Sequence, residues 1–143
     1  MKKAIFLTLS LLLACLCAFA FTGCKALEPV TVADFKAKAE AAEYTVTSDD
    51  TSAAAKKGTE YEIKFKVYDT IASAKADYEA ETDAFPSSSV AHVTVNMPSH
   101  SYSKMTSGNK YYVAYRVGKT FLAVTADSEY KKEIDDFLKT LGY

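Results

Sequence analysis

The stretch that decides the fold is KYYVAYRVGKTFLAVTA, residues 110–126. Its first half, residues 110–117, carries a large apolar side chain at every second position, as a strand with one buried face does: Tyr111, Val113, Tyr115 and Val117. Gly118 and Lys119 then fit a two-residue turn with glycine first, which is a type II′ turn. Because residues 120–126 return as a second strand, the stretch predicts an antiparallel hairpin.

Four more segments upstream are predicted to be strands: residues 44–47, 60–69, 90–97 and 102–106. In residues 60–69 charged side chains alternate with apolar ones, which indicates a sheet with one buried face and one solvated face. The segment 90–97 is expected to point four apolar side chains inward, namely Ala91, Val93, Val95 and Met97. The polar residues 48–59 are predicted to form a loop.

Three helices are predicted around these strands. Thr31 and Asp34 form a capping box that begins the first helix, which ends near Glu43. The second helix follows Thr70, and the third follows residues 127–128. The resulting order, α-β-β-α-β-β-β-β-α, predicts an α+β domain in which a mainly antiparallel sheet has its helices packed on one face.

The N-terminal residues have the pattern of a lipoprotein signal. Two lysines precede an apolar run that ends in FTGC, residues 21–24. This ending resembles the lipobox of bacterial lipoproteins, in which cleavage leaves a lipidated cysteine as the first residue. We therefore predict a signal peptide (1–23), a short tether (24–30) and one α+β domain (31–143), with fatty chains such as palmitate on Cys24. The domain would lie on the extracytoplasmic side of the cell membrane.

Two other fates of this segment stay open. One is ordinary cleavage after Ala20, at the A-x-A site of residues 18–20, and the other is an uncleaved membrane anchor. Residues 12–15, LLAC, form a poorer lipobox that would leave extra apolar residues on the mature chain. With cleavage before Cys24, the other two cysteines are removed and no disulfide is possible within the domain.

Charge and composition argue against several classes of function. Removing residues 1–23 takes away Lys2 and Lys3 and lowers the net charge from −1 to about −3. This balance does not favour nucleic acid as a partner. The two histidines, His92 and His100, lack neighbouring cysteine or acidic ligands, so we predict no metal ion and no cofactor. Ser-x-x-Lys pairs occur without the companion motifs of penicillin-recognising enzymes, so no catalytic residue is predicted.

The ten tyrosines, with no tryptophan, are the strongest sign of binding. Tyr68 and Tyr112 fall on the outer face of the predicted strands, near Lys66 and Arg116. Tyr68, Tyr112 and Arg116 are therefore predicted to form a possible binding surface for a peptide, a glycan or a lipid headgroup. The alternative is that tyrosine is simply favoured in half-buried strands.

The C-terminal part, YYVAYRVGKTFLAVTADSEYKKEIDDFLKTLGY (residues 111–143), is similar to a group of small lipoproteins and membrane-anchored proteins of Gram-positive bacteria. Those proteins share a hairpin with an arginine in its first strand, then an aspartate before a helix of the form EYKxEIxxFLKxLGY. The resemblance implies an extracytoplasmic α+β domain of Gram-positive origin. It implies no activity and no catalytic residues.

Together these observations predict a lipid-anchored, non-enzymatic binding or interaction module. Its partners would be the membrane, through the lipidated N-terminus, and an envelope protein, peptide or glycan. The alternatives are an accessory subunit of a membrane receptor or transporter, and a small cell-envelope enzyme. The enzyme would need a cleft in which a nucleophile lies beside a base.

Overall fold

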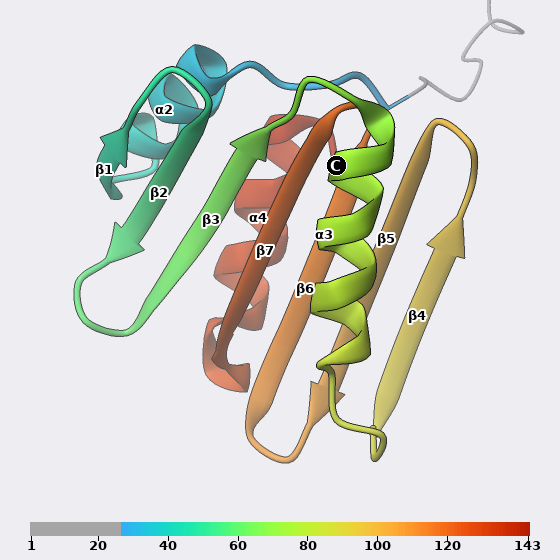
Figure 1. Cartoon of the computed structure of the whole chain (residues 1–143). Coiled ribbons are helices and arrows are strands. Elements are labelled where there is room, and N and C mark those ends of the chain that lie inside the picture. The colour runs from blue at the N-terminus through green and yellow to red at the C-terminus, as the bar shows by residue number, and fades with distance from the viewer. Residues whose placement is uncertain (1–26) are drawn as a thin grey trace, which may run out of the picture.

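The computed structural model describes residues 27–143, so the predicted signal peptide and Cys24 lie outside the described residues. The chain forms one antiparallel sheet with helices against it (Figure 1). The elements are α2 (Val32–Ala41), β1 (Thr45–Ser48), β2 (Ser52–Lys57), β3 (Tyr61–Val67), α3 (Ile71–Asp83), β4 (Ala91–Asn96), β5 (His100–Ser107), β6 (Lys110–Val117), β7 (Thr120–Asp127), the 3-10 helix η1 (Ser128–Tyr130) and α4 (Lys131–Leu141). The seven strands lie in the order β1-β2-β3-β7-β6-β5-β4.

The predicted α+β class and the order of the predicted elements are confirmed, with one strand added. Residues 48–59 were expected to be a loop, but β2 lies within them and pairs with both β1 and β3. The segment SAAAKK has weak intrinsic strand preference, so its pattern does not indicate a strand. Ala53 and Ala55 nevertheless alternate into the core, where they are 5% and 0% exposed. Pairing on both sides and burial of small side chains therefore override the local preference.

The β6–β7 hairpin lies at the centre of the sheet, as the opening stretch predicts. Val117 pairs with Thr120, which leaves Gly118 and Lys119 as the two turn residues. Gly118 has a φ of +56°, the left-handed value that the first position of a type II′ turn requires. The Tyr111 side of this hairpin faces the main core, where Tyr111, Val113, Tyr115, Leu122 and Val124 are all buried.

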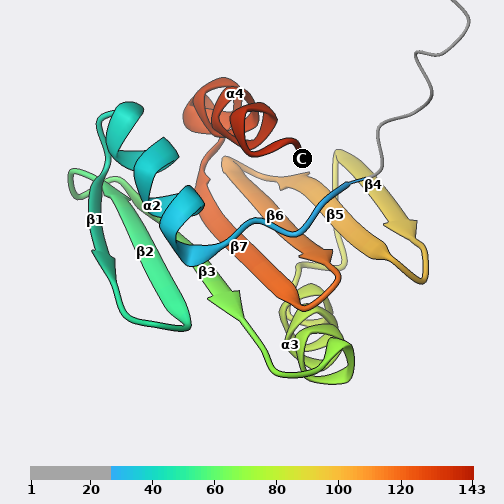
Figure 2. The same ribbon diagram turned by 90° about the horizontal axis from the view of Figure 1, so that it is seen from above.

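The helices cover both faces of the sheet, so the expectation that they share one face is wrong. Helices α2 and α4 lie on one side and α3 on the other (Figure 2). On its own side, α3 packs Tyr78 against Ala114 and Phe121. These sheet residues alternate with the main-core residues, so β6 and β7 are apolar on both faces. A near-continuous apolar strand is typical of burial on both faces, and the sequence carries this signal in residues 110–126.

Strand β4 forms one edge of the sheet, and its predicted inward face is exposed. Val93 is 54% exposed and Met97, just beyond the strand, 53%. Ala91 is also exposed, and Val95 is half-buried. Helix α4 lies over the central strands and does not reach this edge (Figure 2). The alternating pattern therefore predicts the strand correctly. Its apolar face stays exposed because α4, which covers this side of the sheet, lies over other strands.

Candidate functional site

Helix α3 lies over β6 and β7 on its face of the sheet (Figure 1). A groove lies on each side of this helix. The first, which we call the lysine groove, lies between α3 and strands β1 to β3 and has a volume of about 540 Å³. The second, the arginine groove, lies between α3 and strands β4 and β5 and has a volume of about 690 Å³. Both are large enough for a small ligand or a short stretch of polymer.

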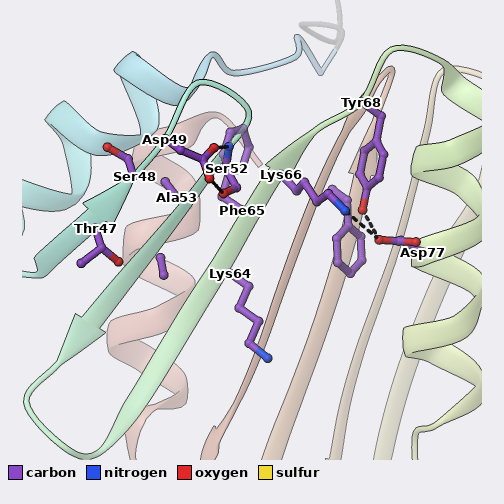
Figure 3. A pocket seen from close by; sticks show the side chains of 12 residues that line it. Thr47, Ser48, Asp49, Ser52, Ala53, Lys64, Phe65, Lys66, Tyr68 and Asp77 are labelled. Atoms are coloured by element: carbon purple, nitrogen blue, oxygen red, sulfur yellow. Dashed lines mark hydrogen bonds and ion pairs between the residues drawn. The ribbon is translucent and has the colours of Figure 1, made fainter.

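In the lysine groove, side chains from β3 face the exposed side of α3 (Figure 3). The ammonium of Lys66 lies 3.8 Å from Oδ2 of Asp77 and 4.5 Å from the centroid of the Tyr68 ring. The Tyr68 hydroxyl donates a hydrogen bond to the same Asp77 oxygen. Burial, and then the hydrogen bond to Asp77, raise the pKa of Tyr68, so it stays a neutral donor at physiological pH.

Lys64 lies on the same face of β3, two residues before Lys66. Within the described part of the chain it has no carboxylate partner, unlike Lys66. Beside these lysines, the buried ring of Phe121 and the half-buried ring of Tyr68 provide apolar surface. The combination of a free ammonium with aromatic surface suits a ligand that offers both acceptor oxygens and apolar contact.

Asp49 closes one end of the lysine groove, at the β1–β2 turn (Figure 3). Its carboxylate accepts hydrogen bonds from the backbone N–H groups of Thr51 and Ser52 at 2.8 and 2.7 Å. The Ser52 hydroxyl donates another at 2.8 Å. These hydrogen bonds, that of Thr51 first, lower the pKa of Asp49. Asp49 thus serves as the acceptor that shapes the turn.

The arginine groove is built over Arg116, the one arginine in the sequence. Arg116 is 2% exposed, and one terminal nitrogen lies 2.8 Å from the backbone oxygen of Met97 and 3.1 Å from the Ser101 hydroxyl. Longer contacts of 3.4 and 3.5 Å reach the backbone oxygens of Pro98 and Ser99. The guanidinium therefore holds the β4–β5 turn through neutral acceptors.

A hydrogen-bonded cluster of His92, Thr94 and Ser103 lies in the same groove. Nε2 of His92 is 2.8 Å from the Ser103 hydroxyl and 2.8 Å from the Thr94 hydroxyl, and the two hydroxyls are 3.3 Å apart. This places a potential nucleophile beside a potential base. Ser103 is only 1% exposed, however, and within residues 27–143 no side chain is hydrogen-bonded to the other ring nitrogen of His92.

The structure does not bring the predicted binding residues together on one exposed surface. Tyr68 borders the lysine groove, Arg116 lies beneath the arginine groove, and α3 lies between the two. Tyr112 is half-buried, and its ring lies 5.4 Å from that of Phe85. The outer face of these strands was expected to be exposed. Helix α3 instead packs against the apolar residues of this face and covers its centre. Cys24 lies outside the described residues.

The sequence pattern did not indicate that Tyr78 or Ser103 belongs to a site. His92 was predicted to be an exposed polar residue, and it is exposed, but its Nε2 also lies 2.8 Å from the Ser103 hydroxyl. Among residues 27–143 no group of three or more His, Cys, Asp or Glu side chains is placed to hold a metal ion. No helix in this same range is both long enough and apolar enough to cross a bilayer.

The comparisons with known proteins bear on the fold. No family model matches the chain, and no curated protein is significantly similar to it. Among solved structures, the crystal structure of a GTP-binding regulator from Thermotoga maritima is similar, with a TM-score of 0.51 and 12% sequence identity. The match covers 78% of this chain and 84% of that one. At this identity the likeness concerns the fold alone.

Proposed function

We propose that the protein is a lipid-anchored, extracytoplasmic binding module and that the lysine groove takes its ligand. The main support for ligand binding is the open groove of about 540 Å³, in which Lys64 has no carboxylate partner among the described residues. Tyr68 and Phe121 supply adjoining aromatic surface. A peptide or glycan of the cell envelope offers the acceptor oxygens and the apolar faces that such a groove binds.

The anchoring part rests on the sequence of residues 21–24. The first described residue, Leu27, follows Cys24 closely, and the first helix begins at Val32. A tether of so few residues spans at most about 20 Å when fully extended, so the domain would stay close to the bilayer. Two or more fatty chains on one cysteine attach a protein stably, whereas a single myristoyl chain does not.

The change Cys24→Ser tests the anchor. We expect the protein to leave the membrane fraction almost completely, because removing the thiol removes the site of lipid attachment. Fractionation of cells with quantitative immunoblotting measures this, and intact-mass analysis of the wild type shows the added lipid. Cys17→Ser is the matched control, since it changes a cysteine within the predicted signal peptide. A wild-type chain that begins at Phe21 with an unmodified sulfur would contradict the anchor.

A photo-crosslinking residue at position 47 tests the groove. Benzoylphenylalanine in place of Thr47 should capture the ligand on intact cells, because this exposed position lines the open groove and leaves Lys64 in place. The same residue in place of Lys139, whose side chain is 71% exposed on α4, is the control. We expect a distinct adduct from position 47, and its loss when Lys64→Ala is added. Equal adducts from positions 47 and 139 would argue against the groove as the binding site.

One observation favours a second candidate, a small cell-envelope hydrolase. The 2.8 Å contact between His92 and Ser103 resembles a base beside a nucleophile. Binding is the better supported function because Ser103 is buried and its histidine nitrogen is shared with Thr94. Labelling of Ser103 by a fluorophosphonate probe, located by peptide mass spectrometry, would establish the hydrolase instead.

A further inference from the structure

We propose that the arginine groove is a second binding site, which takes a ligand with one carboxylate and a short apolar part. Arg116 binds the carboxylate, and Ile71 and Met97 contact the apolar part. The site is separate from the lysine groove, and it depends neither on the proposed lipid anchor nor on the proposed ligand of that groove.

The first argument is the unbalanced charge of Arg116. An arginine that is 2% exposed normally has an acidic partner, because removing a charge from water costs far more than neutral contacts return. None of the ion pairs among residues 27–143 involves Arg116. Its acceptors are three backbone oxygens and the Ser101 hydroxyl, and its Nε–H has no hydrogen-bond partner in the part of the chain that the structure describes. The guanidinium therefore lacks both an anion and one acceptor.

The second argument is an unpaired hydroxyl that lines the same groove. Tyr78 on α3 is 4% exposed, and its buried hydroxyl has no hydrogen-bond partner among residues 27–143. Burial raises the pKa of Tyr78, although the charge of Arg116 acts in the opposite direction, so the group is a neutral donor. Unpaired buried donors are rare in folded proteins, and two that line one groove indicate a missing acceptor.

The charges around the groove favour a monoanion. Lys75 on the rim pairs with Glu79 at 3.3 Å, and Asp83 lies on the same helix. Glu79 offsets Lys75, and Asp83 adds one more negative charge at the rim, so a doubly charged phosphate would meet more repulsion at the mouth than a singly charged carboxylate. A carboxylate has one charge and two oxygens, which match the planar fork of a guanidinium.

Two exposed apolar side chains, Ile71 and Met97, form what we call the apolar wall of the arginine groove. Ile71 is 49% exposed and Met97 is 53% exposed, and both line the groove. Large exposed apolar side chains gathered at a cavity are typical of ligand contact. Met97 is unbranched and flexible, so its side chain can adapt to the apolar part of the ligand.

Nuclear magnetic resonance on the ¹⁵N-labelled full-length chain in a non-ionic detergent tests the site. Because Arg116 is the one arginine, its Nε–H gives a single arginine side-chain signal. We expect acetate and butanoate to shift this signal saturably, with butanoate binding about tenfold more tightly because its added methylenes contact the apolar wall. Butanamide, which is similar in size but uncharged, should leave the signal in place.

The change Ile71→Ser should remove most of the advantage of butanoate over acetate and leave acetate binding unchanged. Val93→Ser is the matched control, because Val93 is similarly exposed but lies outside the groove. The proposal is overturned if neither carboxylate shifts the Nε–H signal, or if butanamide shifts it equally. It is also overturned if inorganic phosphate binds more tightly than butanoate, or if Ile71→Ser leaves the preference intact.

Discussion

The change Phe35→Ala is expected to lower the free energy of unfolding by about 3–5 kcal/mol, the range for a phenylalanine removed from a packed core. Phe35 is 0% exposed and joins three elements. Its ring stacks on Phe65 of β3, with centroids 4.7 Å apart, and meets Phe137 of α4 edge-on at 5.9 Å. Because both partners are held in regular structure, the cavity cannot close easily, and the cost falls at the upper end of core truncations. Urea denaturation followed by circular dichroism measures it.

Val93→Ala is the control for this prediction. It also removes methyl groups from an apolar residue, but at a side chain that is 54% exposed on the edge strand. We expect a change of about 0.5 kcal/mol or less, as for most surface substitutions. Similar losses from Phe35→Ala and Val93→Ala would show that the face under α2 and α4 is not the main core.

The features that could be predicted from the sequence are those fixed by near neighbours along the chain. The Thr31 hydroxyl accepts from the N–H of Asp34 at 3.0 Å, and the Thr70 hydroxyl accepts from the N–H of Ser73 at 3.1 Å, so both predicted helix starts are correct. The two-residue turn at Gly118 follows from the need for a positive φ. Such local interactions are present in the sequence pattern itself.

The features that could not be predicted depend on distant partners. Strand β2 forms because β1 and β3 flank it, and the exposure of Val93 depends on how far α4 reaches. The second face of β6 and β7 differs for another reason. Alternation alone predicts one buried face, whereas the near-continuous apolar run of residues 110–126 indicates burial on both faces and so a helix on each side.

The contact between His92 and Ser103 illustrates how register limits the prediction of a site. The strand was predicted to begin at Tyr102, whereas β5 begins at His100. The N–H of Met97 donates to the backbone oxygen of His100 at 2.8 Å, which leaves residues 98–99 as a two-residue turn. With that turn, Thr94 pairs with Ser103, which brings His92 within hydrogen-bonding distance of the serine. Had the turn at Pro98 been read as a tight hairpin, this pairing would have followed from counting residues.

The second large effect is expected at Asp135 on α4, which joins that helix to the sheet. Its carboxylate accepts from Lys104 at 2.7 Å, from the Tyr111 hydroxyl at 2.8 Å and from Lys131 at 3.2 Å. Asp135→Asn should lower the free energy of unfolding by about 2 kcal/mol, because it weakens partly buried, charge-assisted hydrogen bonds to residues that stay in place. Urea denaturation at neutral pH measures the loss.

The pH dependence separates this network from simple packing. Burial is the largest single influence on the pKa of Asp135 and would raise it, but the hydrogen bonds from Lys104 and Tyr111, with the charge of Lys104, outweigh burial and lower it below 3.8. A carboxyl whose pKa is lower in the folded state than in the unfolded state stabilises the fold above its ordinary pKa, and this stabilisation is lost as the pH falls through the folded-state value. Asp135→Asn should therefore cost most at neutral pH and progressively less below about pH 4.

Asp136→Asn is the matched control, one residue further along α4. Asp136 pairs with Lys132 and Lys139 on the solvent side, where its side chain is 48% exposed. Because exposed ion pairs are screened by salt, the effect of Asp136→Asn should disappear in 1 M salt, at which the Debye length is about 3 Å. The effect of Asp135→Asn should largely persist there, since the Tyr111 hydrogen bond is partly buried. Equal loss of both effects in salt would mean that Asp135 acts as a surface charge and does not fasten α4 to the sheet.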